Sequence, residues 1–141
     1  MPEKQQTILV VDDDPNIAKL IRFYLKNQDY QIESTPDSRQ GIQMARKDQY
    51  DLLLLDMQMP HIDGMTFLKT IAEIPSFETL IIVITAHDPD EEMTVLIEKH
   101  AYDFIQKPFT ANRLRFTIKN ALNYAAIKKK YDEVINSVIT K

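Results

Sequence analysis

The stretch Asp51–Asp56, with the sequence DLLLLD, places four consecutive leucines between two aspartates. Leucine alone would permit a helix, but the run is short and a carboxylate stands at each end. We therefore predict a β-strand over residues 51–55 that is buried on both faces, as in the middle of a parallel sheet. A loop over residues 57–64 follows, with Pro60 and Asp63-Gly64, and then a helix over residues 65–74 that Pro75 closes.

The rest of the chain repeats this alternation of apolar runs and amphipathic stretches. Further strands are predicted over residues 7–11, 30–35, 80–85 and 102–105. Helices are predicted from Asp14-Pro15, from Pro36-Asp37-Ser38, over residues 89–100, and from Thr110 almost to the end. Asp and Pro mark the helix starts because Asp caps helices and Pro suits their first turn. Five strand–helix units predict an α/β fold, a doubly wound five-stranded parallel sheet with helices on both faces.

The composition is that of a single globular domain, with 141 residues, 44% apolar and 27% charged side chains. There is no cysteine, which excludes disulfides and thiol chemistry. The polar start Met1–Gln6 lacks a signal-peptide core, and no apolar run approaches the ~20 residues that cross a bilayer. We therefore expect a soluble, cytoplasmic protein without membrane contact.

The net charge of −4 is unevenly distributed along the chain. Residues 1–110 hold 10 Lys and Arg against 19 Asp and Glu, whereas residues 111–141 hold 7 against 2. The basic end includes Lys128–Lys130, which we interpret as a solvated helix face, because so short a lysine run is weak support for nucleic-acid binding.

Charged or reactive side chains stand at the carboxyl ends of four predicted strands. They are Asp12, Asp13, Asp56, Thr85 and Lys107. Ligands of doubly wound sheets bind at this edge, so these side chains should share one pocket. Neighbouring carboxylates repel each other, and a hard divalent cation such as Mg²⁺, which prefers a few carboxylates plus water, relieves that conflict.

Aspartate can accept a phosphoryl group covalently, and this gives each residue of the pocket a role. Asp56 would attack phosphorus, Asp12 and Asp13 would hold the metal, and Lys107 and Thr85 would contact phosphoryl oxygens. A zinc site is not expected, since the chain has no cysteine and no suitably spaced histidines.

Four motifs of this chain resemble those of the receiver domain of two-component response regulators, the CheY-like family. They are Val10–Pro15 (VVDDDP), Asp56–Gly64 (DMQMPHIDG, matching D-x-x-M-P-x-x-D-G), Ile84–Ala86 (ITA) and Lys107–Phe109 (KPF). The resemblance covers residues 6–125, with the motifs in the family's order and spacing. It implies the strand order 2-1-3-4-5 of flavodoxin-like folds.

The resemblance also implies a function as a phosphorylation-driven switch rather than an enzyme. A sensor histidine kinase or a histidine phosphotransfer protein would phosphorylate Asp56, with Mg²⁺, or Mn²⁺ in its place, held by Asp12, Asp13, Asp56 and the main-chain carbonyl of Gln58. Thr85 and Phe104 would form the switch that reshapes the face made by the fourth helix, fifth strand and fifth helix, and so control a downstream effector. Gln58 and His87 stand where the family tunes phosphoryl lifetime, and the Lys107–Pro108 bond would be cis.

Two rival interpretations remain beside this one. A phosphohydrolase of the haloacid-dehalogenase type would need a second acid two residues after its nucleophile, where this chain has Gln58. A degenerate receiver that binds partners without phosphorylation is disfavoured by the intact set of site residues.

The last predicted helix extends past the usual end of a receiver. Tyr124, Ile127, Tyr131, Val134 and Val138 recur at the 3-4-3-4 spacing of a heptad seam. Residues 126–141 could be a frayed tail or linker, or a coiled coil that joins two receivers into a homodimer. A seam of barely two heptads leaves both readings open.

Overall fold

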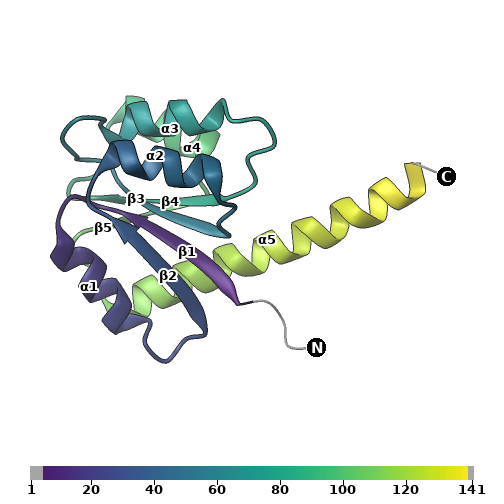
Figure 1. The fold of residues 1–141 in the computed structure, drawn as a ribbon, viewed down its shortest axis with the longest axis horizontal. Coiled ribbons are helices and arrows are strands. Elements are labelled where there is room, and N and C mark those ends of the chain that lie inside the picture. Colours follow the sequence, from purple (N-terminus) through teal and green to yellow (C-terminus); the bar gives the residue numbers. More distant parts are fainter. Residues whose placement is uncertain (1–4, 140–141) are drawn as a thin grey trace.

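A computed structural model describes residues 5–139, so Met1–Lys4 of the polar start, Thr140 and Lys141 lie outside the described residues. Strands and helices alternate along the chain (Figure 1). The strands are β1 (Gln6–Val11), β2 (Tyr30–Thr35), β3 (Leu52–Asp56), β4 (Leu80–Thr85) and β5 (Asp103–Gln106). The helices are α1 (Pro15–Tyr24), α2 (Ser38–Lys47), α3 (Gly64–Ala72), α4 (Glu91–His100) and α5 (Ala111–Ile139).

The five strands form one parallel sheet in the order β2-β1-β3-β4-β5. Leu53 of β3 pairs with Leu9 of β1 on one side and with Ile81 of β4 on the other. The predicted doubly wound α/β fold and its strand order are therefore confirmed. All carboxyl ends of the strands meet at one edge of the sheet.

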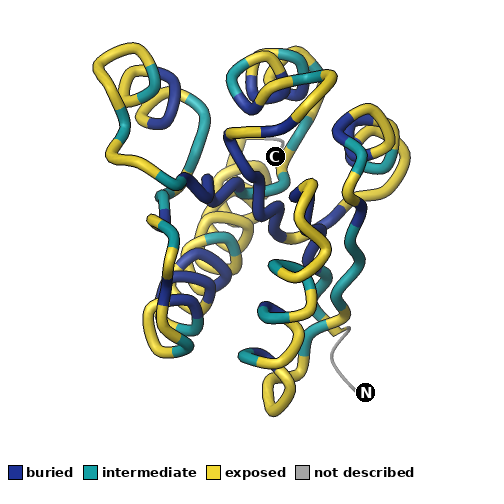
Figure 2. Tube along the Cα trace, turned by 90° about the vertical axis from the view of Figure 1, so that its left-hand side faces the viewer, coloured by how far each residue is buried: buried dark blue, intermediate teal, exposed yellow. Residues whose placement is uncertain are grey.

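Helices cover both faces of this sheet, with α2, α3 and α4 on one side and α1 and α5 on the other (Figure 1). The leucines of β3 alternate between the two layers: Leu53 and Leu55 join the core under α2–α4, while Leu52 and Leu54 join the core over α1 and α5. None of the four leucines is exposed, which explains the unbroken apolar run. Figure 2 shows the buried strands as dark blue segments between partly exposed helices.

Aspartates set the start of four helices. Each accepts a hydrogen bond from a main-chain amide of the first turn, which satisfies one of the donors that a helix leaves free. These caps are Asp14, Asp37, Asp63 and Asp90. The caps place the start of α3 at Gly64 and that of α4 at Glu91, next to the predicted 65 and 89.

The last helix, α5, is 29 residues long, which confirms the predicted extended C-terminal helix. Its buried residues all lie in the first part, between Leu114 and Leu122, where it packs on the sheet. The remainder projects beyond the sheet (Figure 1). Across residues 5–139, no helix has the length and apolar character needed to span a membrane.

Candidate functional site at the carboxyl ends of the strands

Three carboxylates meet at the carboxyl edge of the sheet. Asp12 and Asp13 directly follow β1, and Asp56 is the last residue of the neighbouring strand β3. One oxygen of each carboxylate lies within 4.8 Å of the others. Asp12 and Asp56 are each only 2% exposed, whereas Asp13 is exposed to solvent. The sheet thus places two buried acids behind one accessible acid.

The side chain of Lys107 enters this cluster from the loop after β5. Its Nζ lies 3.0 Å from Oδ2 of Asp12 and 3.7 Å from Oδ2 of Asp56. The Lys107 amide donates a 2.8 Å hydrogen bond to the carbonyl of Thr85, which ties the loop to the end of β4. The Lys107–Pro108 bond is cis, as predicted. One ammonium group therefore faces two buried carboxylates.

The buried carboxylates still have oxygen lone pairs available. Asp12 Oδ1 accepts a 2.9 Å hydrogen bond from the Asp14 amide, and Asp56 Oδ1 accepts one of 3.1 Å from the Gln58 amide. Within residues 5–139, Oδ2 of Asp12 accepts no hydrogen bond beside its ion pair with Lys107. Closely spaced carboxylate oxygens with unused lone pairs are the ligands that Mg²⁺ prefers, so these residues fit such an ion.

Burial raises the pKa of Asp56 to about 7. The negative charge of Asp12 and a hydrogen bond with Asp13 also contribute to this raised pKa, while the Gln58 amide and the Lys107 ammonium oppose it. Ionisation of Asp56 beside the other carboxylates is therefore unfavourable unless a further cation is present.

Thr85 ends β4, and its side chain is buried. Its hydroxyl donates a 2.8 Å hydrogen bond to the carbonyl of His87 and accepts one of 3.2 Å from the His87 amide. The hydroxyl is thus engaged with the β4–α4 loop rather than with the carboxylates. The His87 side chain is exposed.

Two other predicted site residues are Phe104 and Gln58. Phe104 in β5 is half-buried and packs against the core under α2–α4. Gln58 is exposed in the loop after Asp56, to which its amide donates. The structure therefore brings the charged residues together, whereas Thr85 bonds to the main chain of His87 and Phe104 packs on the core.

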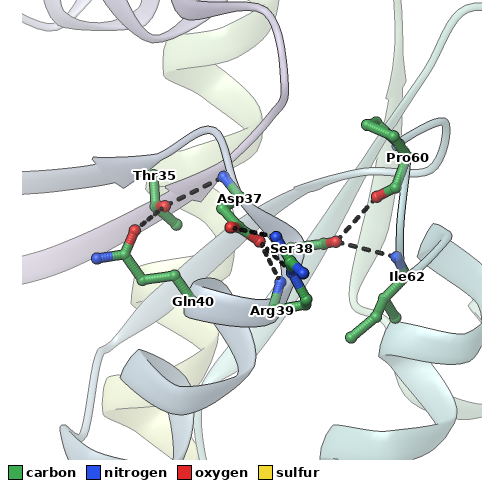
Figure 3. Close-up of polar contacts among 7 residues, drawn as sticks. All are labelled: Thr35, Asp37, Ser38, Arg39, Gln40, Pro60 and Ile62. Atoms are coloured by element: carbon green, nitrogen blue, oxygen red, sulfur yellow. Dashed lines mark hydrogen bonds and ion pairs between the residues drawn. The ribbon is translucent and has the colours of Figure 1, made fainter.

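The loop after Asp56 is held by a residue that the sequence did not single out. Ser38, the first residue of α2, is only 1% exposed. Its hydroxyl donates a 3.1 Å hydrogen bond to the carbonyl of Pro60 and accepts one of 3.1 Å from the amide of Ile62 (Figure 3). A buried serine thus anchors the main chain that carries Gln58.

The same close-up shows how the start of α2 is held in turn. Thr35 ends β2, and its hydroxyl donates a 2.7 Å hydrogen bond to Gln40 Oε1 and accepts one of 3.2 Å from the amide of Asp37 (Figure 3). Asp37 caps the helix. Ser38 therefore stands on a tethered helix start, which restricts the β3–α3 loop that it contacts.

Comparison with known proteins agrees with this geometry. A family model of the response regulator receiver domain matches residues 8–119. The transcriptional regulatory protein RprY of Bacteroides fragilis is 34% identical over 142 residues, which cover 98% of this chain and 58% of that protein. The uncharacterized transcriptional regulatory protein YcbL of Bacillus subtilis is 32% identical, over 93% of this chain and 57% of that protein. The chain thus spans just over half of the length of these relatives.

A solved structure shows the same fold. The crystal structure of a signal receiver domain from Vibrio parahaemolyticus superposes with a TM-score of 0.82 at 30% identity, covering 91% of this chain and 98% of that one. The family-model match includes the sheet edge where the acidic cluster lies, because it extends over both Asp12 and Lys107. The chain belongs to the response regulator receiver domains of two-component systems.

Proposed function

We propose that this chain receives a phosphoryl group on Asp56 in a two-component phosphorelay and acts as a switch on an effector. The observation that supports this most is the convergence of Asp12, Asp13, Asp56 and Lys107 at one edge of the sheet. The donor would be a sensor histidine kinase or a histidine phosphotransfer protein. The chain is then a signalling domain and not a metabolic enzyme.

Asp12, Asp13 and Asp56, with the main-chain carbonyl of Gln58, would hold Mg²⁺ or Mn²⁺. When bound, the ion neutralises charge that builds up on the phosphoryl oxygens. The proposal is supported by the spacing of the three carboxylates and by Oδ2 of Asp12, which faces Lys107 but accepts no hydrogen bond within the described residues. Ser38 would keep the Gln58 carbonyl in place through its bonds to Pro60 and Ile62.

In the proposed reaction, a carboxylate oxygen of Asp56 attacks phosphorus in line with the bond to the donor. The new O–P bond forms as the P–N bond to the donor's imidazole breaks, and the imidazole nitrogen leaves with the electron pair. The Lys107 ammonium compensates charge on the transferred group. Burial of Asp56 limits the water that could compete for it or hydrolyse the product.

Phosphorylation would give the Thr85 hydroxyl a new acceptor. The hydroxyl would leave the carbonyl of His87, and the β4–α4 loop would move with it. Phe104, which is half-buried, would follow into the space that opens, and the face made by α4, β5 and α5 would change. Such a switch is a shift of population between two packings. Gln58 and the exposed His87 would set how readily water reaches the phosphoryl group.

We further propose that residues 6–125 form the receiver and residues 126–141 a helical extension or linker toward the effector. The continuous helix α5 across residue 125 supports a stiff connection. The two curated relatives described above are named as transcriptional regulators and are nearly twice as long as the matched region.

The central test is phosphorylation with a small phosphoryl donor in the presence of Mg²⁺, followed by intact mass. We expect one added phosphoryl group in the wild type and none in Asp56→Asn. Asp14→Asn is the matched control, because it removes a neighbouring carboxylate and asparagine caps a helix as well as aspartate does. Asp14→Asn should be modified like the wild type.

Metal binding is tested separately by calorimetric titration with Mg²⁺. Asp13→Asn should bind Mg²⁺ at least about tenfold more weakly while keeping its fold, since Asp13 is exposed. If the wild type neither binds Mg²⁺ nor gains mass, the chain is a degenerate receiver that acts without phosphorylation. If modification survives in Asp56→Asn, the acceptor is a different residue.

A further inference from the structure

The projecting part of α5 has an exposed apolar side. Five side chains on it recur at the 3-4-3-4 spacing, and they are between 48% and 70% exposed: Tyr124, Ile127, Tyr131, Val134 and Val138. We call these five residues the α5 seam. At 100° per residue they share one side of the helix, so the exposed surface is a continuous stripe rather than scattered positions.

The opposite side of the same helix is polar and faces its own domain. Ala126, Lys129 and Glu133 line a groove together with Gln49, Pro75 and Glu78, which lie in the loops after α2 and α3. The receiver therefore already neighbours the polar side of α5. Apart from the contact of Tyr124 with Tyr102, the seam is exposed in a single copy, so another molecule could cover it.

We propose that a second copy of this chain covers the seam, so that two α5 helices pair in parallel as a short coiled coil. A second copy offers an identical stripe at the same spacing, which is what a two-fold symmetric contact requires. Tyr124 and Tyr131 then take the a positions with Val138, and Ile127 and Val134 take the d positions.

The heptad positions of the seam favour the parallel arrangement. In parallel pairing, Lys128 lies opposite Asn123 of the other copy, and Lys130 lies opposite Ile135, so no like charges meet. An antiparallel pair matches each a position with a d position of the other copy, and the seam has three a positions but only two d positions, so Tyr124 would lack an apolar partner. The sequence therefore disfavours the antiparallel alternative.

The tyrosines favour two helices over three. In a two-stranded coil the phenol hydroxyl at an a position can reach water beside the partner helix, whereas the closed core of a trimer would bury it without a partner. The five side chains expose on the order of 500 Å² per copy, so a dimer buries roughly 1,000 Å². That area is at the lower limit for specific interfaces, so we expect a dimer that dissociates on dilution.

The seam also connects to the receiver. The ring of Tyr124 lies 5.5 Å from the ring of Tyr102, which directly precedes β5. Phe104, the proposed switch residue, is two residues farther along. The first layer of the seam is thus in contact with the residue that precedes the strand that the proposed switch would move.

The test is the oligomeric state of the full chain by sedimentation across a concentration series. We expect a monomer–dimer equilibrium whose dissociation constant rises at least about tenfold in Ile127→Glu, because a buried carboxylate opposes pairing. The matched control is Ala126→Glu, which adds the same charge one residue away on the polar side and should dimerise like the wild type. A wild type that stays monomeric, forms trimers, or dimerises undiminished after Ile127→Glu overturns the proposal.

Orientation is tested by oxidation of Val138→Cys, which introduces the only thiol of the chain. In the parallel dimer each thiol faces its own copy, and a disulfide forms. In antiparallel pairing, position 138 lies opposite Ile127 of the other copy, so the two thiols are about 16 Å apart along the helices, beyond disulfide reach. A dimer that does not cross-link overturns the parallel arrangement.

The experiment also separates this proposal from the proposed function. Asp56→Asn should dimerise and cross-link like the wild type, since the seam exists in the unphosphorylated chain. Loss of phosphorylation with an intact dimer would contradict only the role of Asp56. A phosphorylated chain without a dimer would contradict only the pairing.

Discussion

Replacement of Gly64 by alanine should destabilise the chain far more than the same replacement at its other glycine, Gly41. Gly64 begins α3, and its amide donates a 3.2 Å hydrogen bond to the carbonyl of Met57. A Cβ on Gly64 would come within 2.4 Å of Met57 Cα and 2.5 Å of its Sδ. Met57 directly follows Asp56, so the clash falls on the main chain that positions the proposed acceptor.

The magnitude follows from which atoms have to move. Overpacking a core costs about 1–3 kcal/mol when side chains can adjust, and a clash with buried main chain belongs at or above the upper end, so we expect about 3 kcal/mol. At Gly41 the added Cβ meets only side chains, with Val11 Cγ2 at 2.9 Å and Phe67 Cε2 at 3.2 Å. Alanine inside a helix also gains about 0.5–1 kcal/mol over glycine, so Gly41→Ala should change stability by less than about 1 kcal/mol.

Urea unfolding followed by circular dichroism measures both variants. In thermal unfolding of a chain of this size, a loss of about 3 kcal/mol of stability corresponds to a lowering of Tm by roughly 10 °C. Phosphorylation of Gly64→Ala should also slow at a temperature where the variant remains folded, whereas Gly41→Ala should react like the wild type. The reasoning is refuted if Gly64→Ala unfolds at the wild-type midpoint, or if Gly41→Ala is the more damaging change.

Other substitutions test the same structure. Because burial raises the pKa of Asp56 to about 7, the folded chain binds a proton that the unfolded chain releases near pH 4, so stability should fall as pH rises between about 4 and about 7. Asp56→Asn should remove the contribution of Asp56 to this pH dependence of stability. At about pH 8 without Mg²⁺, the variant should therefore be more stable than the wild type. Urea titrations at several pH values measure both effects. Ser38→Ala leaves the Pro60 carbonyl and Ile62 amide without their partner, so it should lose about 1–3 kcal/mol of stability and bind Mg²⁺ more weakly by calorimetry. Leu54→Ala leaves a cavity at a fully buried position, so denaturant titration should show a loss of about 2–5 kcal/mol of stability. Under conditions where the variant is folded, its Mg²⁺ affinity should equal that of the wild type.

Much of the fold could be predicted because local patterns and global packing agree. The DLLLLD run favoured a short strand buried on both faces over a helix, and the structure places its leucines alternately in the two core layers. The element ends were less predictable. Pro75 was expected to close α3, yet the helix ends at Ala72, because the residue before a proline avoids helical geometry and the last turn is lost.

The candidate site was predictable where it depends on strand ends, and not where it depends on loops. Asp12, Asp56 and Lys107 converge because parallel strands share one edge. Ser38 was missed because a buried serine at a helix start has no local pattern that reports its distant main-chain partners. The left-handed backbone of His61, with φ of 71°, was also hidden, since no glycine marks that turn.

The partners of Lys107 and Thr85 bear on how the proposed switch would work. Nζ of Lys107 lies nearer to Asp12, at 3.0 Å, than to Asp56, at 3.7 Å, and the Thr85 hydroxyl is bonded to the His87 carbonyl. Both groups would have to exchange these partners for phosphoryl oxygens. Thr85 pairs in register with Gln106 of β5 and Lys107 directly follows β5, so the exchange would move the carboxyl end of this strand.

Tyr102 precedes β5 at the other end and contacts Tyr124. A shift along this four-residue strand would therefore reach the first layer of the α5 seam. Phosphorylation should therefore change the dissociation constant of the α5 dimer, and Tyr102→Ala should weaken that dependence while leaving phosphorylation of Asp56 intact.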